Sequence, residues 1–174
     1  EQQRHHRYDR EAVLASIEKL GPKEHFSLFG GECLILPLKD VEELLSIAYK
    51  KSGHSGLQTN GALITPQHIE VFAKYKTHVG ISLDGPDELN DSRWAGTVDA
   101  TRKQTARTHW AIRALVEKSK EFPHLMPSLI LTLHAGNCSK DRFPRFVAWL
   151  HELDEMGIQH INLHLMEMDH NAHT

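Results

Sequence analysis

Two adjacent glycines and an acid, Gly30, Gly31 and Glu32, are the first residues whose types suit binding chemistry. They follow residues 25–29, an apolar run that predicts a short buried strand. Glycine has no side chain, so a ligand can approach the backbone at Gly30 and Gly31. The carboxylate of Glu32 can accept a charge-assisted hydrogen bond from an ammonium group. The pattern therefore indicates a strand end that binds a ligand. A plain Gly-Gly turn with an exposed acid explains the same residues equally well.

Four more polar clusters follow the later apolar segments. They are QTNG from Gln58, SLDG from Ser82, HAGN from His134 and MEMD from Met166. Alone, each has an ordinary explanation, because Asn-Gly and Asp-Gly-Pro are common turn sequences. In parallel α/β folds, however, ligands bind at the carboxyl ends of the strands, where loops and helix N-termini converge. Since all these clusters are predicted to lie at that end, their order indicates a single site.

The elements that would position these clusters alternate between helix and strand. Helical spacing of apolar residues predicts helices over 9–21, 39–53, 65–73, 99–120 and 139–157. Strands are expected at 25–29 and within SGLQTNG, HVGISLDG, SLILTLHAG and IQHINLHLMEM. Because no tight hairpin joins two of these five strands, the fold class is α/β, with right-handed βαβ units and a parallel sheet. An open doubly wound sheet and an arc of a β/α barrel both fit.

The order of the elements also predicts an incomplete fold. The sequence starts with a helix and stops on a strand, so the strand that should precede the first helix is missing. We therefore expect residues 1–174 to be a single domain, cut from something larger.

Composition narrows the class of protein. The chain has 174 residues, of which 40% are hydrophobic and 25% charged, as in a soluble globular domain. A net charge of -3 gives no support for a nucleic-acid partner. No apolar run approaches the ~20 residues of a membrane span, and the N-terminus is too polar for a secretory signal. We expect a cytoplasmic protein that binds neither nucleic acid nor membrane.

The residues that most often bind metals show no ligand spacing. Cys33 and Cys138 are the only cysteines, they form no C-x2-C pair, and we interpret both as reduced thiols. The fourteen histidines follow no metal-binding pattern. We therefore expect no metal ligands within this chain.

The order of FSLFGGE, QTNGALIT and VGISLDGPDELNDSR resembles the radical S-adenosylmethionine (radical SAM) superfamily, in particular its peptide- and sulfatase-maturing group with a SPASM-type C-terminal extension. The close match runs from Phe26 to Arg93. The resemblance implies a partial (β/α)6, TIM-like barrel with its first strand and C-terminal end missing. It also implies an oxidoreductase-like maturase, in which a [4Fe-4S] cluster reduces S-adenosyl-L-methionine to a 5'-deoxyadenosyl radical that abstracts hydrogen from a peptide or protein substrate. An electron donor such as flavodoxin or ferredoxin would then be a partner.

The resemblance implies roles for the residues at the first two strand ends. Gly30, Gly31 and Glu32 would receive the methionine amino group of the cofactor. Gln58 and Asn60 would line the cofactor cavity. These roles give the Gly-Gly-Glu cluster a function that turn chemistry alone does not require.

The resemblance also implies roles for residues at the later strand ends. Ser82 and Arg93 would contact the methionine carboxylate, since a guanidinium binds a carboxylate through two parallel hydrogen bonds. Asp84 would be the catalytic candidate that orients substrate or takes a proton, or else a turn residue. His164 would bind the cofactor. Adenine or substrate contacts are also expected from three further residues: His134, Asn137 and Glu167.

One part of the family pattern is absent from the sequence. No C-x3-C-x2-C motif occurs, and Cys33 stands where the family has proline. Either the cluster loop precedes Glu1, or the protein is a degenerate homologue without a cluster. Because the first strand and the cysteines are missing together, we favour the former and expect cluster ligands outside this chain. A non-redox nucleotide- or metabolite-binding module is the alternative, although no G-x-G-x-x-G motif supports it.

Overall fold

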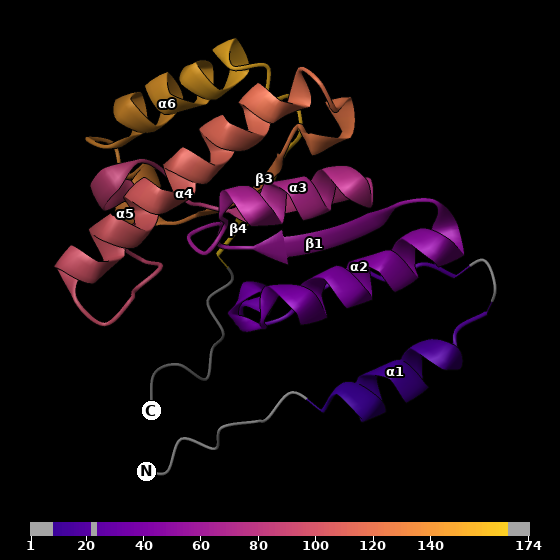
Figure 1. Cartoon of the computed structure of the whole chain (residues 1–174). Coiled ribbons are helices and arrows are strands. Elements are labelled where there is room, and N and C mark those ends of the chain that lie inside the picture. Colours follow the sequence, from indigo (N-terminus) through magenta and orange to yellow (C-terminus); the bar gives the residue numbers. More distant parts are fainter. Residues whose placement is uncertain (1–8, 22–23, 167–174) are drawn as a thin grey trace, which may run out of the picture.

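The computed structural model describes residues 9–21 and 24–166 (Figure 1). In this part of the chain, four parallel strands form one sheet in the order β1-β2-β3-β4. The strands are β1 (Ser55–Thr59), β2 (Thr77–Ser82), β3 (Ser128–Leu133) and β4 (Ile161–Leu165). Each strand pairs with the next one in sequence, so every connection is a crossover and all carboxyl ends share one edge of the sheet.

All helices except α5, which the sequence did not predict, lie close to the predicted segments. They are α1 (Arg10–Glu18), α2 (Leu38–Ser52), α3 (Pro66–Lys74), α4 (Val98–Ser119), α5 (Ala135–Cys138) and α6 (Phe143–Glu155), with 3-10 turns η1 (Cys33–Ile35), η2 (Asp87–Asn90) and η3 (Pro123–Leu125). The predicted helix starts are confirmed: the side chains of Asp9 and Thr65 accept from the backbone N–H groups of Ala12 and His68. Gly53 ends α2 with a φ of 78°, as its sequence position indicates.

The prediction of a strand at residues 25–29 is wrong, and with it the count of five strands. Among the described residues, only Leu28 pairs with β1: its N–H donates to the Gly56 carbonyl, and its carbonyl accepts from the Gln58 N–H, both at 2.9 Å. The chain leaves the extended conformation directly afterwards, at Gly30 and Gly31. A single bridge is too short to count as a strand, but it holds the glycine turn beside the carboxyl end of β1.

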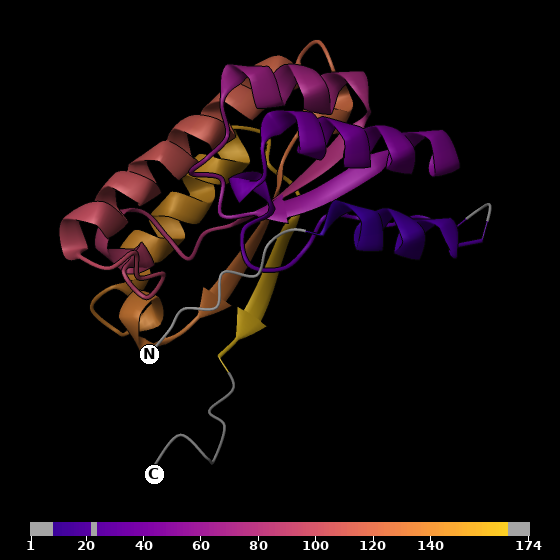
Figure 2. The same ribbon diagram turned by 60° about the horizontal axis from the view of Figure 1, so that its bottom comes forward.

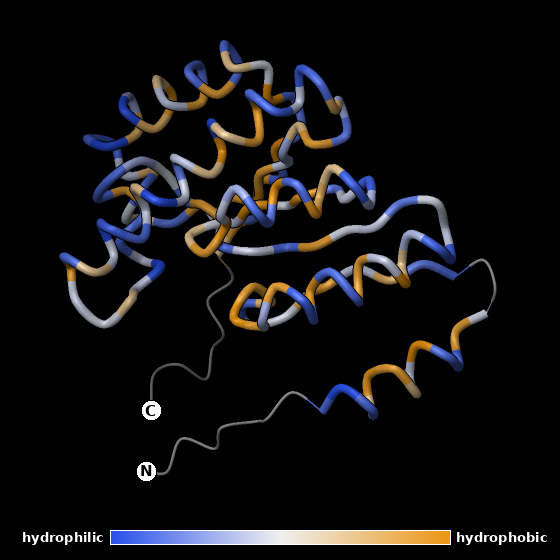
Figure 3. The backbone as a smooth tube through the Cα atoms, in the orientation of Figure 1, coloured by the Kyte–Doolittle hydropathy of each residue, from blue (hydrophilic) through white to orange (hydrophobic). Residues whose placement is uncertain are grey.

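The two faces of the sheet differ in character. Helices α2, α3, α4 and α6 lie on one face (Figures 1 and 2). Alternate strand residues face them and are buried: Leu57, Val79, Ile81, Leu129 and Leu131. Apolar and polar residues alternate along the helices, as expected for helices with one buried side (Figure 3). The helix layer therefore supplies the core.

The opposite face of the sheet carries mostly polar or small residues, and no helix of the described part covers it. The pairing Gln58↔Gly80, Ser82↔Ile130 and Thr132↔His164 places these side chains on that face. Polar residues at the carboxyl edge of an open face are accessible to a ligand. In residues 9–21 and 24–166, no helix has the length and apolar character needed to cross a membrane.

Candidate functional site

The chain turns sharply at Gly30 and Gly31, where φ is 99° and 52°. Residues with a Cβ rarely adopt these values, so the backbone itself explains both glycines. A Cβ built at either position would meet no atom of the described residues within 4 Å. The space beside the turn is therefore open, and its peptide groups are accessible to a ligand.

Glu32 connects this turn to the end of β1. Its Oε1 accepts from the Leu34 N–H at 3.1 Å and the Thr59 hydroxyl at 2.6 Å, and its Oε2 accepts from the Asn60 N–H at 2.9 Å. A carboxylate has about four acceptor sites, so three bonds leave roughly one for a ligand. Glu32 thus anchors the turn as well as offering a charge. The sequence prediction did not include Thr59, although its position inside the QTNG cluster could have indicated it.

A cavity of about 190 Å³ opens at the carboxyl ends of β1 and β2. It is lined by Phe29, Gly30, Gly31, Gln58, Thr59, Asn60, Ser82 and Arg93. All predicted cofactor-binding residues except Glu32 and His164 are among them. Glu32 adjoins the cavity through its bonds to Thr59 and Asn60. The convergence predicted for the first three strand-end clusters is therefore present in the structure.

The polar groups of the cavity are partly held by one another. Gln58 Nε2 donates to Ser82 Oγ at 3.1 Å, which links the ends of β1 and β2. Asn60 Oδ1 accepts from the Ala62 N–H at 2.9 Å, while the Asn60 carbonyl accepts from the Thr108 hydroxyl of α4 at 2.8 Å. These bonds fix the side-chain oxygen and the carbonyl of Asn60.

Arg93 brings a positive charge to the cavity wall. Its Nη2 donates to Asp84 Oδ1 at 2.7 Å, and its side chain is 28% exposed. Its Nε is enclosed and has no hydrogen-bond partner among the described residues. A buried N–H without an acceptor is unfavourable, so this atom carries a cost in the described structure.

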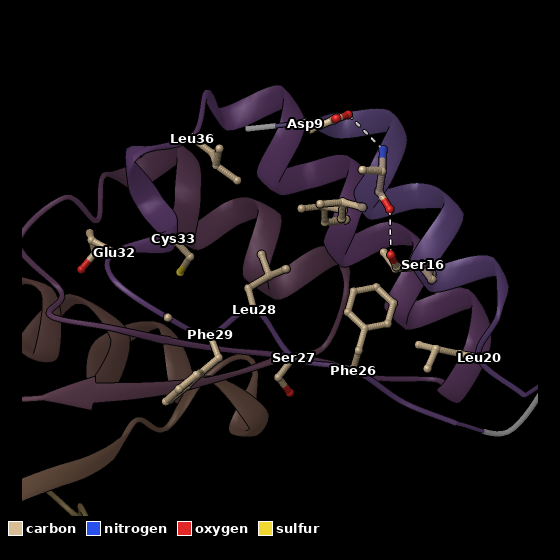
Figure 4. A pocket seen from close by; sticks show the side chains of 15 residues that line it. Asp9, Ser16, Leu20, Phe26, Ser27, Leu28, Phe29, Glu32, Cys33 and Leu36 are labelled. Carbon is tan, nitrogen blue, oxygen red and sulfur yellow. Dashed lines mark hydrogen bonds between the residues drawn. The ribbon is translucent and has the colours of Figure 1, made fainter. Parts of the chain in front are cut away.

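A larger groove of about 720 Å³ lies between α1 and residues 26–36 (Figure 4). Its wall is mainly apolar, with Leu20, Phe26 and Leu28 among the side chains drawn. The side chains of Asp9 and Ser16 are engaged within α1, as the dashed lines in Figure 4 show. Glu32 lines this groove, whereas Gln58, Ser82 and Arg93 line the smaller cavity.

The residues predicted from the later strands are placed differently. His164 is exposed on the open face beside Thr132 and does not line the 190 Å³ cavity. His134 begins α5, and its Nδ1 accepts from the Gly136 N–H. Asn137 is 0% exposed, with its amide bonded to the carbonyls of Asp84 and Thr132. Glu167 lies outside the described residues.

Neither cysteine is prepared to act as a thiolate. Burial, and next the nearby charge of Glu32, raise the pKa of Cys33 to about 11, and its Sγ donates to the Gln58 carbonyl. Burial also raises the pKa of Cys138. Both thiols are free, as predicted. Within the described residues, no three His, Cys, Asp or Glu side chains are grouped to hold a metal ion.

The comparison with protein families decides the class. Residues 4–131 match the family described as the Radical SAM superfamily. This chain belongs to the radical SAM superfamily. The match covers most of the chain and includes every residue that lines the cavity. The resemblance predicted from the strand-end motifs is confirmed.

Relatives of known class are anaerobic sulfatase-maturating enzymes. The serine-type enzyme of Bacteroides thetaiotaomicron is 34% identical over 74 residues, which are 40% of this chain and 18% of that protein. The cysteine-type enzyme of Clostridium perfringens is 32% identical over 92 residues, which are 47% of this chain and 25% of that protein. Each alignment therefore covers only a small part of the relative.

A solved structure shares the fold of this radical SAM chain. Native anSMEcpe with bound AdoMet and Cp18Cys peptide superposes with a TM-score of 0.65 at 16% identity, over 95% of this chain and 45% of that one. Since the identity is low, this likeness concerns the fold alone. The four-stranded α/β arrangement thus corresponds to part of the fold of that chain.

Proposed function

We propose that this chain is the cofactor-binding core of a radical SAM enzyme that modifies a peptide or protein side chain. The single observation that carries the proposal is the 190 Å³ cavity, which is lined by the glycine turn and Arg93 at one strand edge and adjoined by the Glu32 carboxylate. An amino-acid group has an ammonium and a carboxylate, and the cavity has an acceptor and a donor for them.

The residues present fit the amino-acid part of S-adenosyl-L-methionine. Arg93 lines the cavity, and its guanidinium is a charge-assisted donor that suits a carboxylate. The remaining acceptor site of Glu32 and the carbonyls of the open glycine turn suit an ammonium group. In this role Ser82 would contact the carboxylate, and Gln58 and Asn60 would line the cavity.

The cavity is too small to enclose the whole cofactor. Pockets that enclose a whole drug-sized ligand measure about 300–1,000 Å³. A cavity of about 190 Å³ holds only part of such a ligand. We therefore place the adenosyl part along the open face of the sheet, in the direction of Thr132 and His164. His164 is retained as a cofactor-binding candidate on that ground.

S-adenosyl-L-methionine and a [4Fe-4S] cluster, when bound, supply the one-electron chemistry of this superfamily. The described residues offer no ligand set for the cluster, so its ligands are expected outside this chain. The chain's own residues bind and orient the amino-acid group. The polar open face supplies the surface beside which a substrate side chain would be positioned.

The wider setting of this core is also part of the proposal. The single bridge of Leu28 at one edge and the exposed Leu163 and Leu165 of β4 at the other are consistent with an arc of a (β/α)6 barrel that is one domain. A peptide partner is supported by the Cp18Cys peptide bound in the related structure. An electron donor such as flavodoxin or ferredoxin follows from the same chemistry.

Calorimetry with S-adenosyl-L-methionine tests the proposal. Arg93→Gln should weaken binding about tenfold or more, because charge-assisted hydrogen bonds contribute about 1.5–3 kcal/mol. Arg102→Gln is the matched control, since Arg102 pairs with Asp91 away from the cavity. Absence of binding, or equal losses in the two variants, would contradict the proposal. In the full-length protein reconstituted with iron and sulfide, release of 5'-deoxyadenosine separates an active enzyme from a scaffold that only binds.

A further inference from the structure

We propose that Asp84 is a positioning residue that orients the Arg93 guanidinium toward the ligand carboxylate, and that Ser92 and His134 hold Asp84 in place. The inference rests on the proposed function, in which Arg93 binds that carboxylate. It gives Asp84 a role different from the three that the sequence left open, which were orienting the substrate, taking a proton and forming a turn.

The surroundings of the Asp84 carboxylate favour positioning over proton transfer. Asp84 is 3% exposed and does not line the 190 Å³ cavity. Its Oδ1 accepts from Arg93 Nη2 and from the Thr132 N–H, both at 2.7 Å. Its Oδ2 accepts from Ser92 Oγ at 3.3 Å. A carboxylate engaged in this way is shielded from a ligand, but its bond to Nη2 restrains the guanidinium of Arg93.

The backbone of Asp84 is fixed as firmly as its side chain. The Asp84 N–H donates to Asn90 Oδ1 at 2.9 Å, and its carbonyl accepts from Asn137 Nδ2 at 2.8 Å. Both asparagines are buried. Residues of η2 and α5 therefore hold the carboxylate at a constant place beyond the end of β2, and a buried network of this kind is rigid.

Hydrogen-bond directions assign the role of His134. Its Nδ1 accepts from the Gly136 N–H at 3.0 Å, so the neutral ring carries its proton on Nε2. Nε2 lies 2.8 Å from Ser92 Oγ and donates to it. The Ser92 hydroxyl proton is then free to point to Asp84 Oδ2. At 3.9 Å, His134 Nε2 is too far from Asp84 to bond directly, so Ser92 is the link.

Two opposing effects act on Arg93, and orientation should outweigh charge. Asp84 partly neutralises the guanidinium, which weakens its attraction for a second carboxylate. Without Asp84, however, the long side chain regains rotamer freedom and can turn to solvent, since it is 28% exposed. Hydrogen bonds to a ligand require one fixed orientation of the fork. Loss of Asp84 should therefore weaken recognition of the carboxylate.

The experiment compares two ligands by calorimetry: S-adenosyl-L-methionine and its decarboxylated form, which keeps the amine and the adenosyl group. Asp84→Asn should lower affinity for S-adenosyl-L-methionine about tenfold, while affinity for the decarboxylated ligand changes less than about twofold. Ser92→Ala should give a smaller loss, about threefold, with the same selectivity. Asp91→Asn is the matched control, because Asp91 forms a similar pair with Arg102 close by in sequence and should change neither affinity.

The outcomes separate the inference from the proposed function. Equal losses for both ligands in Asp84→Asn would show a merely structural role and overturn the inference, as would tighter binding of S-adenosyl-L-methionine. If Asp84→Asn does not fold, Ser92→Ala decides: an unchanged preference between the ligands overturns the inference. Failure of the unaltered protein to bind either ligand would refute the proposed function itself.

Discussion

Replacing Thr59 by valine should loosen the link between the glycine turn and β1. Valine has nearly the same shape, so the buried methyl packing of Thr59 is kept. The variant loses the 2.6 Å bond from the Thr59 hydroxyl to Glu32 and leaves the Gly61 N–H without its acceptor at 3.0 Å. A hydrogen bond to a charged group contributes about 1.5–3 kcal/mol, and an unsatisfied buried N–H costs about 1 kcal/mol or more.

Together these losses predict a decrease of about 2.5–4 kcal/mol in the free energy of unfolding. Since domains are stable by about 5–15 kcal/mol, this is a large fraction of the total. The melting temperature should fall by roughly 5–15 °C for a chain of this length. Urea unfolding followed by tryptophan fluorescence gives the free energy directly.

Thr108→Val is the matched control for this variant. Thr108 is also buried, but its hydroxyl donates only to neutral acceptors, the carbonyls of Asn60 at 2.8 Å and Gln104 at 3.1 Å. Its loss should cost about 0.5–1.5 kcal/mol. If Thr59→Val were no more destabilising than Thr108→Val, the Glu32 carboxylate would not be the anchor of the turn, and the reasoning would be refuted.

Three further predictions follow from backbone conformation and burial. Gly31→Ala should destabilise less than Gly61→Ala in urea unfolding, because both have positive φ but only at Gly61 would a Cβ meet a neighbour, Thr108 Cγ2, at 3.2 Å. Burial raises the pKa of Cys33 to about 11, so iodoacetamide at pH 8 should alkylate it on the order of 100-fold more slowly than a free cysteine; a normal rate would contradict this. Burial lowers the pKa of His68, so the unfolded chain takes up a proton first and the free energy of unfolding should fall as the pH drops below about 6.5. His68→Leu should flatten that pH dependence, and an unchanged slope would assign it to other groups.

Local signals predicted most of the fold. Asp9, the Thr65–Pro66 pair and Gly53 act through bonds and dihedral angles within a few residues, so their effect is visible in the sequence. The failure at residues 25–29 has the opposite cause. A strand needs a ladder of partners, and only Leu28 obtains one in the described structure. Hydrophobicity alone does not reveal how many partners a segment will find.

The sequence predicted where the site residues lie, but not which hydrogen bonds they form. The motif order brought Gly30, Asn60, Ser82 and Arg93 to one strand edge, since parallel strands share their carboxyl ends. What the sequence did not show is that Asp84 is Arg93's partner. That pair depends on the path of the chain through η2, which is a tertiary result.

The end of the site near Asp84 is held by many hydrogen bonds, whereas the end at β4 is exposed. This difference bears on the specificity for ligands. Around Asp84 the side-chain and backbone groups are bonded on every side, so the geometry offered to an amino-acid group is set by this chain. At β4, by contrast, His164 and its neighbours are exposed. A group bound at the ordered end meets a fixed arrangement of donors, which rejects ligands that lack the matching charge. Under the proposed function, we therefore expect selection between substrates to depend on contacts made at the open end, where the side chains of β4 are exposed.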